Sequence, residues 1–321
     1  MNERELLARL VVGPVSGDVL ARESGQTRAA IWKNIETLRT AGIDIDARAG
    51  RGYVLRQPVS LLDSAAIVAA LPDSASAGIA SLDVTWAIDS TNNALLREST
   101  PRQGVAVLLA ERQTGGRGRR GRTWTSPLAA NLYLSVARYF GGGLARLGGL
   151  SLVAGVAVAE CLHALGYNDA RLKWPNDVVI GPRKLGGILV EGGGEHAGPA
   201  RAVVGIGINV RMPHADAFDI DQPWIDLAAI GASLPSRNAL AAGVLAHLLP
   251  ALDTFDREGL APFLPRYPAV DGLAGRTITV QAGDGDHAGQ ALGIADDGAL
   301  RVRLLDGERR FHAGDVSVRP Q

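Results

Sequence analysis

The sequence lacks the features that are typical of membrane proteins, of exported proteins and of proteins stabilised by disulfides or cysteine-bound metals. Its 321 residues include one cysteine, Cys161, which excludes an internal disulfide and a cysteine-based metal cluster. The longest uncharged apolar stretch, Leu147 to Ala159, is shorter than the roughly 20 residues that a membrane span needs. The N-terminus, MNERELLARL, lacks the apolar segment of an export signal. These absences predict a cytoplasmic protein with no membrane association and no dedicated metal site.

Lysine is also scarce. The chain has thirty arginines and only three lysines, Lys33, Lys173 and Lys184, although its net charge is zero. Where so arginine-rich a chain retains a lysine, the compact ammonium on a flexible stem is a candidate for a role of its own. Lys173 and Lys184 are therefore candidate functional residues. The alternative is chance retention on a solvated surface.

The chain divides into regions of different character, and its length predicts two or three domains. The first region is residues 1–58. Its helical patterns cover Glu3 to Val12, Asp18 to Glu23 and the segment between the N-cap Thr27 and the stop at Gly42. Two short strand patterns, Ile43 to Ala47 and Tyr53 to Leu55, then flank a glycine-arginine tip. This order predicts a winged helix-turn-helix.

In such a module the third helix enters the major groove of DNA. Residues 27–56 carry six basic and three acidic side chains, a net charge of +3, which is modest and favours binding as a dimer. The predicted DNA-binding residues are Thr27, Arg28, Trp32, Lys33, Arg39 and Arg51. The alternative is a small helical domain that binds a protein.

The other two regions differ in periodicity. Residues 61–268 alternate strand and helix patterns, which predicts an α/β or α+β sheet covered on one face. The strand patterns are Val105 to Glu111, Asn131 to Tyr139, Arg171 to Ile180, Leu185 to Glu191 and Ala202 to Val210. The helical patterns are near Thr91 to Glu98, Leu147 to Leu165 and Asn238 to Glu258. Residues 271–321 are rich in turns between short runs such as Thr277 to Gln281 and Leu300 to Leu304, which predicts a small β-barrel.

The second region contains a glycine-arginine loop, Gly116 to Trp124, which reads GRGRRGRTW. Five arginines and no acidic residue lie between Arg112 and Trp124. Glycines let the backbone approach a ligand and expose its N–H groups, and guanidinium groups pair with phosphate oxygens and carboxylates. The loop therefore predicts a site for a phosphate or an acyl phosphate.

Two other nucleotide-binding interpretations of this loop fail. Gly116, Gly118 and Gly121 match G-x-G-x-x-G, but a dinucleotide fold needs a helix at the glycines and an acidic residue roughly 20 positions later. Here Thr123 to Pro127 breaks any helix, and the next acidic residue is Glu160. A P-loop is excluded because the chain has no Gly-Lys dipeptide. A flexible loop that binds nucleic acid without specificity remains an alternative.

Four further motifs accompany the loop. They are Asp89 to Asn92 (DSTN), Lys173 to Asp177 (KWPND), Arg183 to Glu191 (RKLGGILVE) and Gly205 to Val210 (GIGINV). In this order and at these separations, with the loop, they resemble the biotin-protein ligase family of the bifunctional kind, which also represses biotin synthesis genes. The resemblance covers essentially the whole chain. It implies an α+β protein with an N-terminal winged helix-turn-helix, a central mixed-sheet domain of the biotin/lipoate ligase type and a C-terminal SH3-like β-barrel.

The resemblance also implies a two-step reaction. Biotin and ATP, accompanied by Mg²⁺, give biotinyl-5'-AMP and pyrophosphate, and a lysine of the biotin carboxyl carrier domain of acetyl-CoA carboxylase then takes the biotin. In such proteins biotinyl-AMP favours a homodimer that binds operator DNA. A lipoate-protein ligase, which would lack the winged helix, and a biotin sensor that has lost catalysis are the alternatives.

Site residues follow from the same resemblance. The positions that match the biotin site are Ser90, Thr91, Asn92, Gln113, Arg117, Gly118, Arg119 and Lys184. Those that match the nucleotide site are Arg119, Arg120, Arg122, Trp124, Asn176, Asn209, Trp224 and Arg319. The implied catalytic roles are to hold the intermediate (Arg119), to offset negative charge (Lys184) and to orient or deprotonate the acceptor amine (Asp177). The alternatives are helix capping by DSTN, a structural Lys173–Asp177 bridge and strand packing by the glycines of GIGINV.

Overall fold

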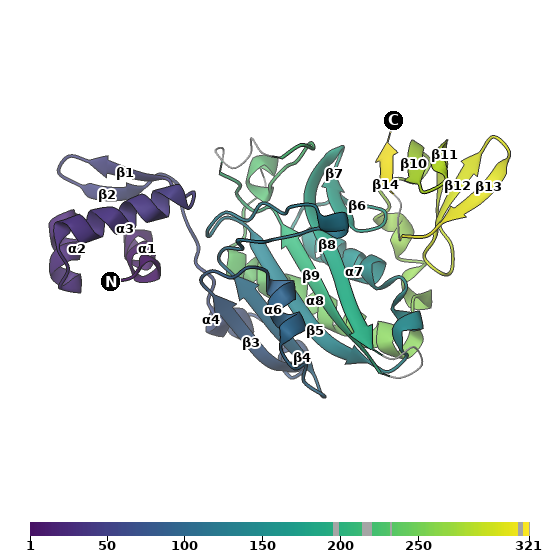
Figure 1. The fold of residues 1–321 in the computed structure, drawn as a ribbon, viewed down its shortest axis with the longest axis horizontal. Helices are drawn as coiled ribbons and strands as arrows, with labels where there is room; N and C mark the ends of the chain where they lie inside the picture. The colour runs from purple at the N-terminus through teal and green to yellow at the C-terminus, as the bar shows by residue number, and fades with distance from the viewer. Residues whose placement is uncertain (195–198, 214–219, 232, 314–316, 321) are drawn as a thin grey trace.

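The computed structural model describes residues 1–194, 199–213, 220–231, 233–313 and 317–320 (Figure 1). A small N-terminal module is joined by an extended segment to a large central sheet, and the C-terminal strands lie at the opposite side of that sheet. The central sheet therefore separates the two ends of the chain.

The N-terminal module is a winged helix-turn-helix, as predicted. It consists of α1 (Glu3–Val12), α2 (Gly17–Ser24), α3 (Arg28–Thr40), β1 (Ile45–Arg48) and β2 (Gly52–Leu55), with the two strands paired antiparallel. The side chains of Asn2, Ser16 and Thr27 each accept a hydrogen bond from the first turn of the helix that follows. Gly25 ends α2 in the left-handed conformation.

The central sheet has seven strands in the order β3-β4-β5-β9-β8-β7-β6. β3 and β4 are parallel and every other pair is antiparallel. The strands are β3 (Ile79–Thr85), β4 (Val105–Ala110), β5 (Leu132–Phe140), β6 (Ala170–Lys173), β7 (Asp177–Ile180), β8 (Arg183–Gly194) and β9 (Ala200–Ile208). The sheet is mixed, which agrees with the predicted class.

Alternation along the strands assigns each face of the sheet to different helices. On one face, side chains such as Val107, Leu134 and Ile206 belong to the same core cluster as α7 (Leu150–Ala164) and α8 (Arg237–Glu258). On the other face, Leu108 and Ala137 pack with α6 (Thr91–Arg97). Ser135 and Gly205 on this second face lie against Asn92 of α6, and Gly207 lies against Trp124 of the glycine-arginine loop. The polar side chains described below therefore gather on the face that carries α6.

Sequence patterns were wrong in two places in this domain. The single strand predicted from Arg171 to Ile180 is the hairpin β6–β7, because Pro175 cannot donate a ladder hydrogen bond and lies in the turn between them. The elements before α6 were not predicted, namely α4 (Ser64–Ala69), α5 (Asp73–Ser76) and β3. The two helices are short, and β3 at the sheet edge shows no regular alternation of buried and exposed residues.

The C-terminal strands form a five-stranded antiparallel sheet in the order β13-β12-β11-β10-β14. They are β10 (Thr277–Ala282), β11 (Gly285–Ile294), β12 (Leu300–Leu304), β13 (Gly307–Phe311) and β14 (Ser317–Pro320). β14, the last of these strands, pairs with β10, the first of them, and the all-antiparallel arrangement agrees with the predicted all-β C-terminal domain.

Among the residues that the structure describes, one helix, α8, is long and apolar enough to cross a bilayer by length and composition. More than half of its apolar window, 56%, is buried inside the protein, so the test is also met by an ordinary core helix. Leu240, Leu245 and Leu252 of α8 are fully buried. The helix is therefore weak support for a membrane span.

Candidate functional site

The glycine-arginine loop follows β4 and folds back on itself. The backbone N–H of Gly118 donates to the carbonyl of Arg122 at 2.7 Å, and that of Trp124 donates to the carbonyl of Gly116 at 2.9 Å. Arg120, with φ 59°, turns the chain in the left-handed region. The loop is thus a defined turn that carries Arg117, Arg119 and Arg122.

A group of polar side chains lies at the base of this loop. Oε1 of Gln113 accepts hydrogen bonds from the backbone N–H of Thr91 at 2.9 Å and from its hydroxyl at 3.1 Å. Nε2 of Gln113 donates to Oγ of Ser126 at 3.3 Å. Ser90 is the N-cap of α6, with its Oγ 3.4 Å from the N–H of Asn93. Capping, the structural alternative for DSTN, is therefore the contact that Ser90 makes.

Asn92 continues the polar group toward the loop. It is 4% exposed, and its Oδ1 accepts from Oγ of Ser135 at 2.6 Å. Its Nδ2 donates to Oε2 of Glu191 at 2.9 Å. The other carboxylate oxygen of Glu191 binds Nη2 of Arg117 at 2.7 Å. The helix, two strands and the loop are thus linked side chain to side chain.

Arg119 reaches in a different direction from Arg117. Its Nη1 donates to Oδ1 of Asn176 at 3.3 Å, and its Nη2 donates to the carbonyl of Ala313 in the C-terminal region. Nδ2 of Asn176 donates to the carbonyl of Ile188 at 2.9 Å, which fixes the asparagine on β8. Arg119 therefore joins the loop to both the central domain and the C-terminal region.

Lys184 and Asp177 form the most enclosed ion pair beside the loop. Their Nζ and Oδ1 atoms are 2.7 Å apart, and the side chains are 17% and 18% exposed. The Lys184 ammonium also lies 5.5 Å from the ring centroid of Trp124, within cation–π range. Asp177 therefore pairs with Lys184, and not with Lys173 as the structural alternative for KWPND had it.

Trp124 occupies its place because two strand positions have no side chain. A Cβ at Gly207 would lie 2.7 Å from the indole of Trp124, and one at Gly187 would lie 3.5 Å from it. The indole Nε1 is buried and has no hydrogen-bond partner in the protein. A buried N–H without an acceptor costs about 1–3 kcal/mol, so this atom is a candidate donor to a ligand.

Three cations gather next to this pair. Burial lowers the pKa of the Lys173 ammonium, and the charges of Lys184, Arg122 and Arg319 lower it further, against the opposing charge of Asp177. These groups come from β6, β8, the loop and β14. Such a concentration of positive charge is suited to an anion with several charges.

Asn209 and Trp224 lie next to Lys184. Nδ2 of Asn209 donates to the carbonyls of Ile225 at 3.1 Å and Lys184 at 3.4 Å. Trp224 is bridged to Lys184 through backbone hydrogen bonds of its neighbours Pro223 and Ile225. Asn209 is therefore a buried brace, and Trp224 is held half-exposed beside the lysine.

Most positions predicted for the ligand site thus converge. The two residues that link them, Ser135 and Glu191, were not predicted. Ser135 is a polar residue between the apolar Leu134 and Val136 of β5, which was the available signal. Glu191 ends the RKLGGILVE motif, but its role depends on an arginine 74 positions away. Arg120 is exposed on the turn and makes no side-chain hydrogen bond that places it toward this group.

Comparison with known proteins identifies the family. The model of the biotin/lipoate A/B protein ligase family matches residues 84–209, that of the biotin protein ligase C-terminal domain matches 274–319, and a helix-turn-helix model matches 4–54. The bifunctional ligase/repressor BirA of Escherichia coli is 40% identical over 98% of this chain and 96% of its own. The chain belongs to the biotin protein ligase family.

Other members of the family differ in the share of the chain that they match. The biotin–[acetyl-CoA-carboxylase] ligase of Paracoccus denitrificans is 34% identical over 71% of this chain and 96% of its own. A structure of the Aquifex aeolicus biotin protein ligase in complex with biotin and ATP has a TM-score of 0.64 and 27% identity, and covers 75% of this chain and all of that one. The N-terminal helix-turn-helix is therefore the feature that this family member shares with the bifunctional ligase/repressors.

The winged helix of this biotin protein ligase carries a groove of about 640 Å³ between α2, α3 and the wing. Arg28, Trp32 and Arg48 line it, and Trp32 is 57% exposed. Arg28 pairs with Asp18 at 3.2 Å, where both side chains are exposed to solvent. An exposed tryptophan between two arginines is suited to a ligand that has both negative charges and an apolar group.

The other predicted DNA-binding residues have different surroundings. Lys33 and Arg51 are exposed, and Thr27 caps α3. The guanidinium of Arg39 binds the carbonyl of Ile45 through Nε at 3.0 Å and Nη2 at 2.7 Å. Arg39 therefore fastens α3 to the wing, and its side chain is engaged within the module.

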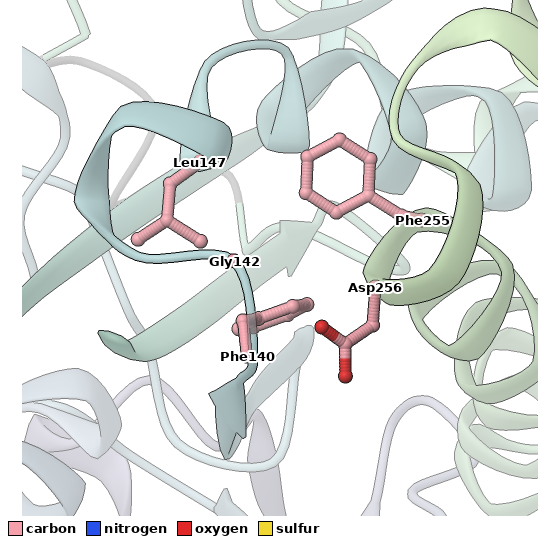
Figure 2. Close-up of a pocket in the computed structure, with 5 residues that line it drawn as sticks. All are labelled: Phe140, Gly142, Leu147, Phe255 and Asp256. Atoms are coloured by element: carbon pink, nitrogen blue, oxygen red, sulfur yellow. The ribbon is translucent and has the colours of Figure 1, made fainter. Parts of the chain in front are cut away.

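A second cavity lies away from the loop and is not a substrate site. Phe140, Gly142, Leu147, Phe255 and Asp256 surround it between the turn after β5 and α8 (Figure 2). Its volume of about 10 Å³ is close to that of a single water-sized probe. Biotin and ATP are far larger than this cavity, so neither of them fits in it.

Proposed function

We propose that this protein activates biotin with ATP, transfers it to a lysine of a biotin carboxyl carrier domain, and represses biotin synthesis genes when biotinyl-AMP is bound. The observation that carries the ligase assignment is the enclosed Lys184–Asp177 pair beside the unpartnered indole N–H of Trp124, under a loop of arginines. This arrangement provides cations for phosphate, a donor for a ligand acceptor and a carboxylate for an amine.

In the first step, a biotin carboxylate oxygen attacks the α-phosphorus of ATP and pyrophosphate leaves. Negative charge on the phosphoryl oxygens rises, and Lys184 and Arg119 are placed to offset it. Lys173, Arg122 and Arg319 supply further positive charge for the polyphosphate. Mg²⁺ would be bound by the phosphates of ATP, and the carboxylate of Asp177 lies within this group of cations, paired with Lys184.

In the second step, the acceptor lysine amine attacks the carbonyl carbon of biotinyl-AMP and AMP leaves with the bonding electron pair. Oδ1 of Asp177 is held by Lys184, and its other oxygen is available to orient the amine and accept its proton. The polar group of Thr91, Gln113 and Ser126 supplies hydroxyl and amide groups of the type that pair with a ureido ring.

Transfer to a purified biotin carboxyl carrier domain, followed by mass spectrometry, tests this function. The wild type is expected to add one biotin in the presence of MgATP and none with lipoate, whereas a sensor without catalysis would add neither. Asp177→Asn is expected to transfer biotin from preformed biotinyl-AMP at least tenfold more slowly. Normal transfer by Asp177→Asn would assign Asp177 a purely structural pairing with Lys184.

Regulation belongs to the same proposal. Biotinyl-AMP favours a homodimer in the cytoplasm, and the two winged helices then meet the two halves of an operator. The complete helix-turn-helix and its exposed Arg28, Trp32, Lys33 and Arg51 support this. Sedimentation with biotin and MgATP is expected to show a dimer at concentrations where the protein alone is a monomer. A monomer under both conditions would contradict it.

A further inference from the structure

Glu191 lies between the polar pocket and the glycine-arginine loop, and neither the sequence nor the proposed reaction gives it a role. It is on β8, in register with Val203 of β9, and its carboxylate is partly buried. Each carboxylate oxygen has one side-chain partner, Arg117 of the loop at 2.7 Å and Asn92 of α6 at 2.9 Å. One carboxylate thus joins two segments that are far apart in the chain.

The partner on the α6 side is fixed. Asn92 is buried, and its Nδ2 also donates to the carbonyl of Leu189 at 3.2 Å. Its Oδ1 can only accept, so the single hydroxyl proton of Ser135 is directed to it at 2.6 Å. A Cβ at Gly205 would lie 2.3 Å from that Oδ1, so the glycine leaves room for the amide.

The partner on the loop side is held by fewer groups. Arg117 is exposed, and its guanidinium donates a hydrogen bond to Glu191. The backbone hydrogen bonds of the loop are internal to it, between Gly118 and Arg122 and between Gly116 and Trp124. Glu191 therefore connects the buried Asn92 to the loop at Arg117, in addition to the contacts that Arg119 makes with Asn176 and Ala313. A charge-assisted hydrogen bond of this kind is stronger than a neutral one.

We propose that Glu191 is a positioning residue that fastens the loop over the bound biotinyl-AMP and sets how long the intermediate is retained. This inference rests on the proposed ligase function. Loss of the carboxylate leaves Lys184, Asp177 and Arg119 in place, since Lys184 and Asp177 pair with each other and Arg119 binds Asn176. The effect falls mainly on retention and on the KM for biotin, and less on kcat.

The test measures release of the intermediate. Enzyme is loaded with radiolabelled biotin, MgATP and pyrophosphatase, freed of small molecules by gel filtration, and the protein-bound label is followed over time. Glu191→Ala and Arg117→Ala are each expected to release the label on the order of tenfold faster than the wild type. The double variant is expected to be no faster than either single one, because both remove the same contact.

A matched control is Glu160→Ala. Glu160 lies on α7, away from the loop, and its carboxylate pairs with Arg266 at 2.5 Å. This variant is expected to release the label at the wild-type rate. If Glu191→Ala lowers the thermal stability, Glu191→Asp, which keeps the charge on a shorter stem, is expected to give an intermediate release rate. Wild-type retention by Glu191→Ala or Glu191→Asp, or additive effects with Arg117→Ala, would overturn the proposal. A wild type that never acquires label would instead contradict the ligase function.

Discussion

The two ends of this chain are attached to the ligase domain in different ways. Buried residues of the C-terminal strands, such as Ile278 and Val302, belong to the same continuous core as α7 and α8. The winged helix has its own core, in which the buried residues described from the ligase domain are Leu128 and Ala129. The C-terminal strands are thus part of the enzyme's folding unit, and the winged helix is a separate body placed by a small contact.

The same difference is seen at the candidate site. The C-terminal region contributes the carbonyl of Ala313 to Arg119 and the charge of Arg319 to the cation cluster. In the winged helix, cations pair with acids of the same module, as Arg28 does with Asp18 and Arg56 with Asp46. Changes at the C-terminal end are therefore expected to affect catalysis, and changes in the winged helix to affect DNA binding.

The largest effect is expected at two tryptophans. One indole binds the C-terminal region of the chain, and the other binds the winged helix. Nε1 of the buried Trp174 donates to the carbonyl of Gly298 at 3.0 Å, and Nε1 of Trp86 reaches Oε2 of Glu3 at 3.4 Å. Trp174→Ala is expected to lower the free energy of unfolding by about 3–5 kcal/mol and to reduce adenylate formation. Trp86→Ala is expected to lower it by about 1 kcal/mol. Denaturant unfolding measures both, and equal losses would contradict the separate-body description.

Arg319 tests the catalytic contribution of the C-terminal strands. Arg319→Ala is expected to raise the KM for ATP by roughly 10- to 100-fold, the range for loss of a hydrogen bond to a charged group. Arg303, an exposed arginine on β12 of the same sheet, is the control, and Arg303→Ala is expected to leave the KM unchanged. Equal KM values for the two variants, from steady-state kinetics, would exclude Arg319 from the nucleotide site.

Trp32 tests the winged helix. Trp32→Ala is expected to weaken binding to sites selected from a random DNA pool by about tenfold, because an exposed apolar side chain on α3 can contact thymine methyl groups. Carrier-domain labelling is expected to be unchanged. The control is Val12→Ala, another exposed apolar residue outside the groove. A loss of ligase activity in Trp32→Ala would show that the two bodies are more tightly coupled than their contact suggests.

The smallest effect is expected at Asp46 in the wing. Hydrogen bonding to Arg56 lowers the pKa of Asp46. This contact therefore contributes stability above the ordinary carboxyl pKa of about 3.9, and that contribution is lost as the pH falls through the lowered value. Asp46→Asn is expected to change DNA affinity at neutral pH by less than about threefold, since exposed ion pairs contribute little. Fluorescence anisotropy with labelled DNA measures this affinity, and a larger change would show that Asp46 takes part in DNA recognition.

How far the sequence predicts this protein depends on the range of the contacts. Local signals located the helix caps at Thr27 and Ser90 and the glycine-arginine loop. Periodicity did not separate β6 from β7, because apolar residues continue through both strands and the turn is only three residues long. It also could not show that Arg39 binds within the module, since the acceptor is a backbone carbonyl set by tertiary folding.

The ligand site shows the same limit. Sequence motifs named residues on the loop, α6, β7 and β8 without giving their partners. The pairing of Lys184 with Asp177 and the link from Asn92 through Glu191 to Arg117 depend on strand register, which brings distant positions together. Residue types were predictable from motifs, and the connections between them were not.

Biotin-dependent exchange of labelled pyrophosphate into ATP tests the central claim most directly, because it requires neither the acceptor domain nor DNA. The wild type is expected to show exchange only when biotin is present. Lys184→Ala is expected to lower the exchange rate by about 100-fold or more, since Lys184 offsets charge in the adenylation step. Absence of exchange in the folded wild type, or exchange that does not depend on biotin, would contradict the assignment of this site to biotin activation.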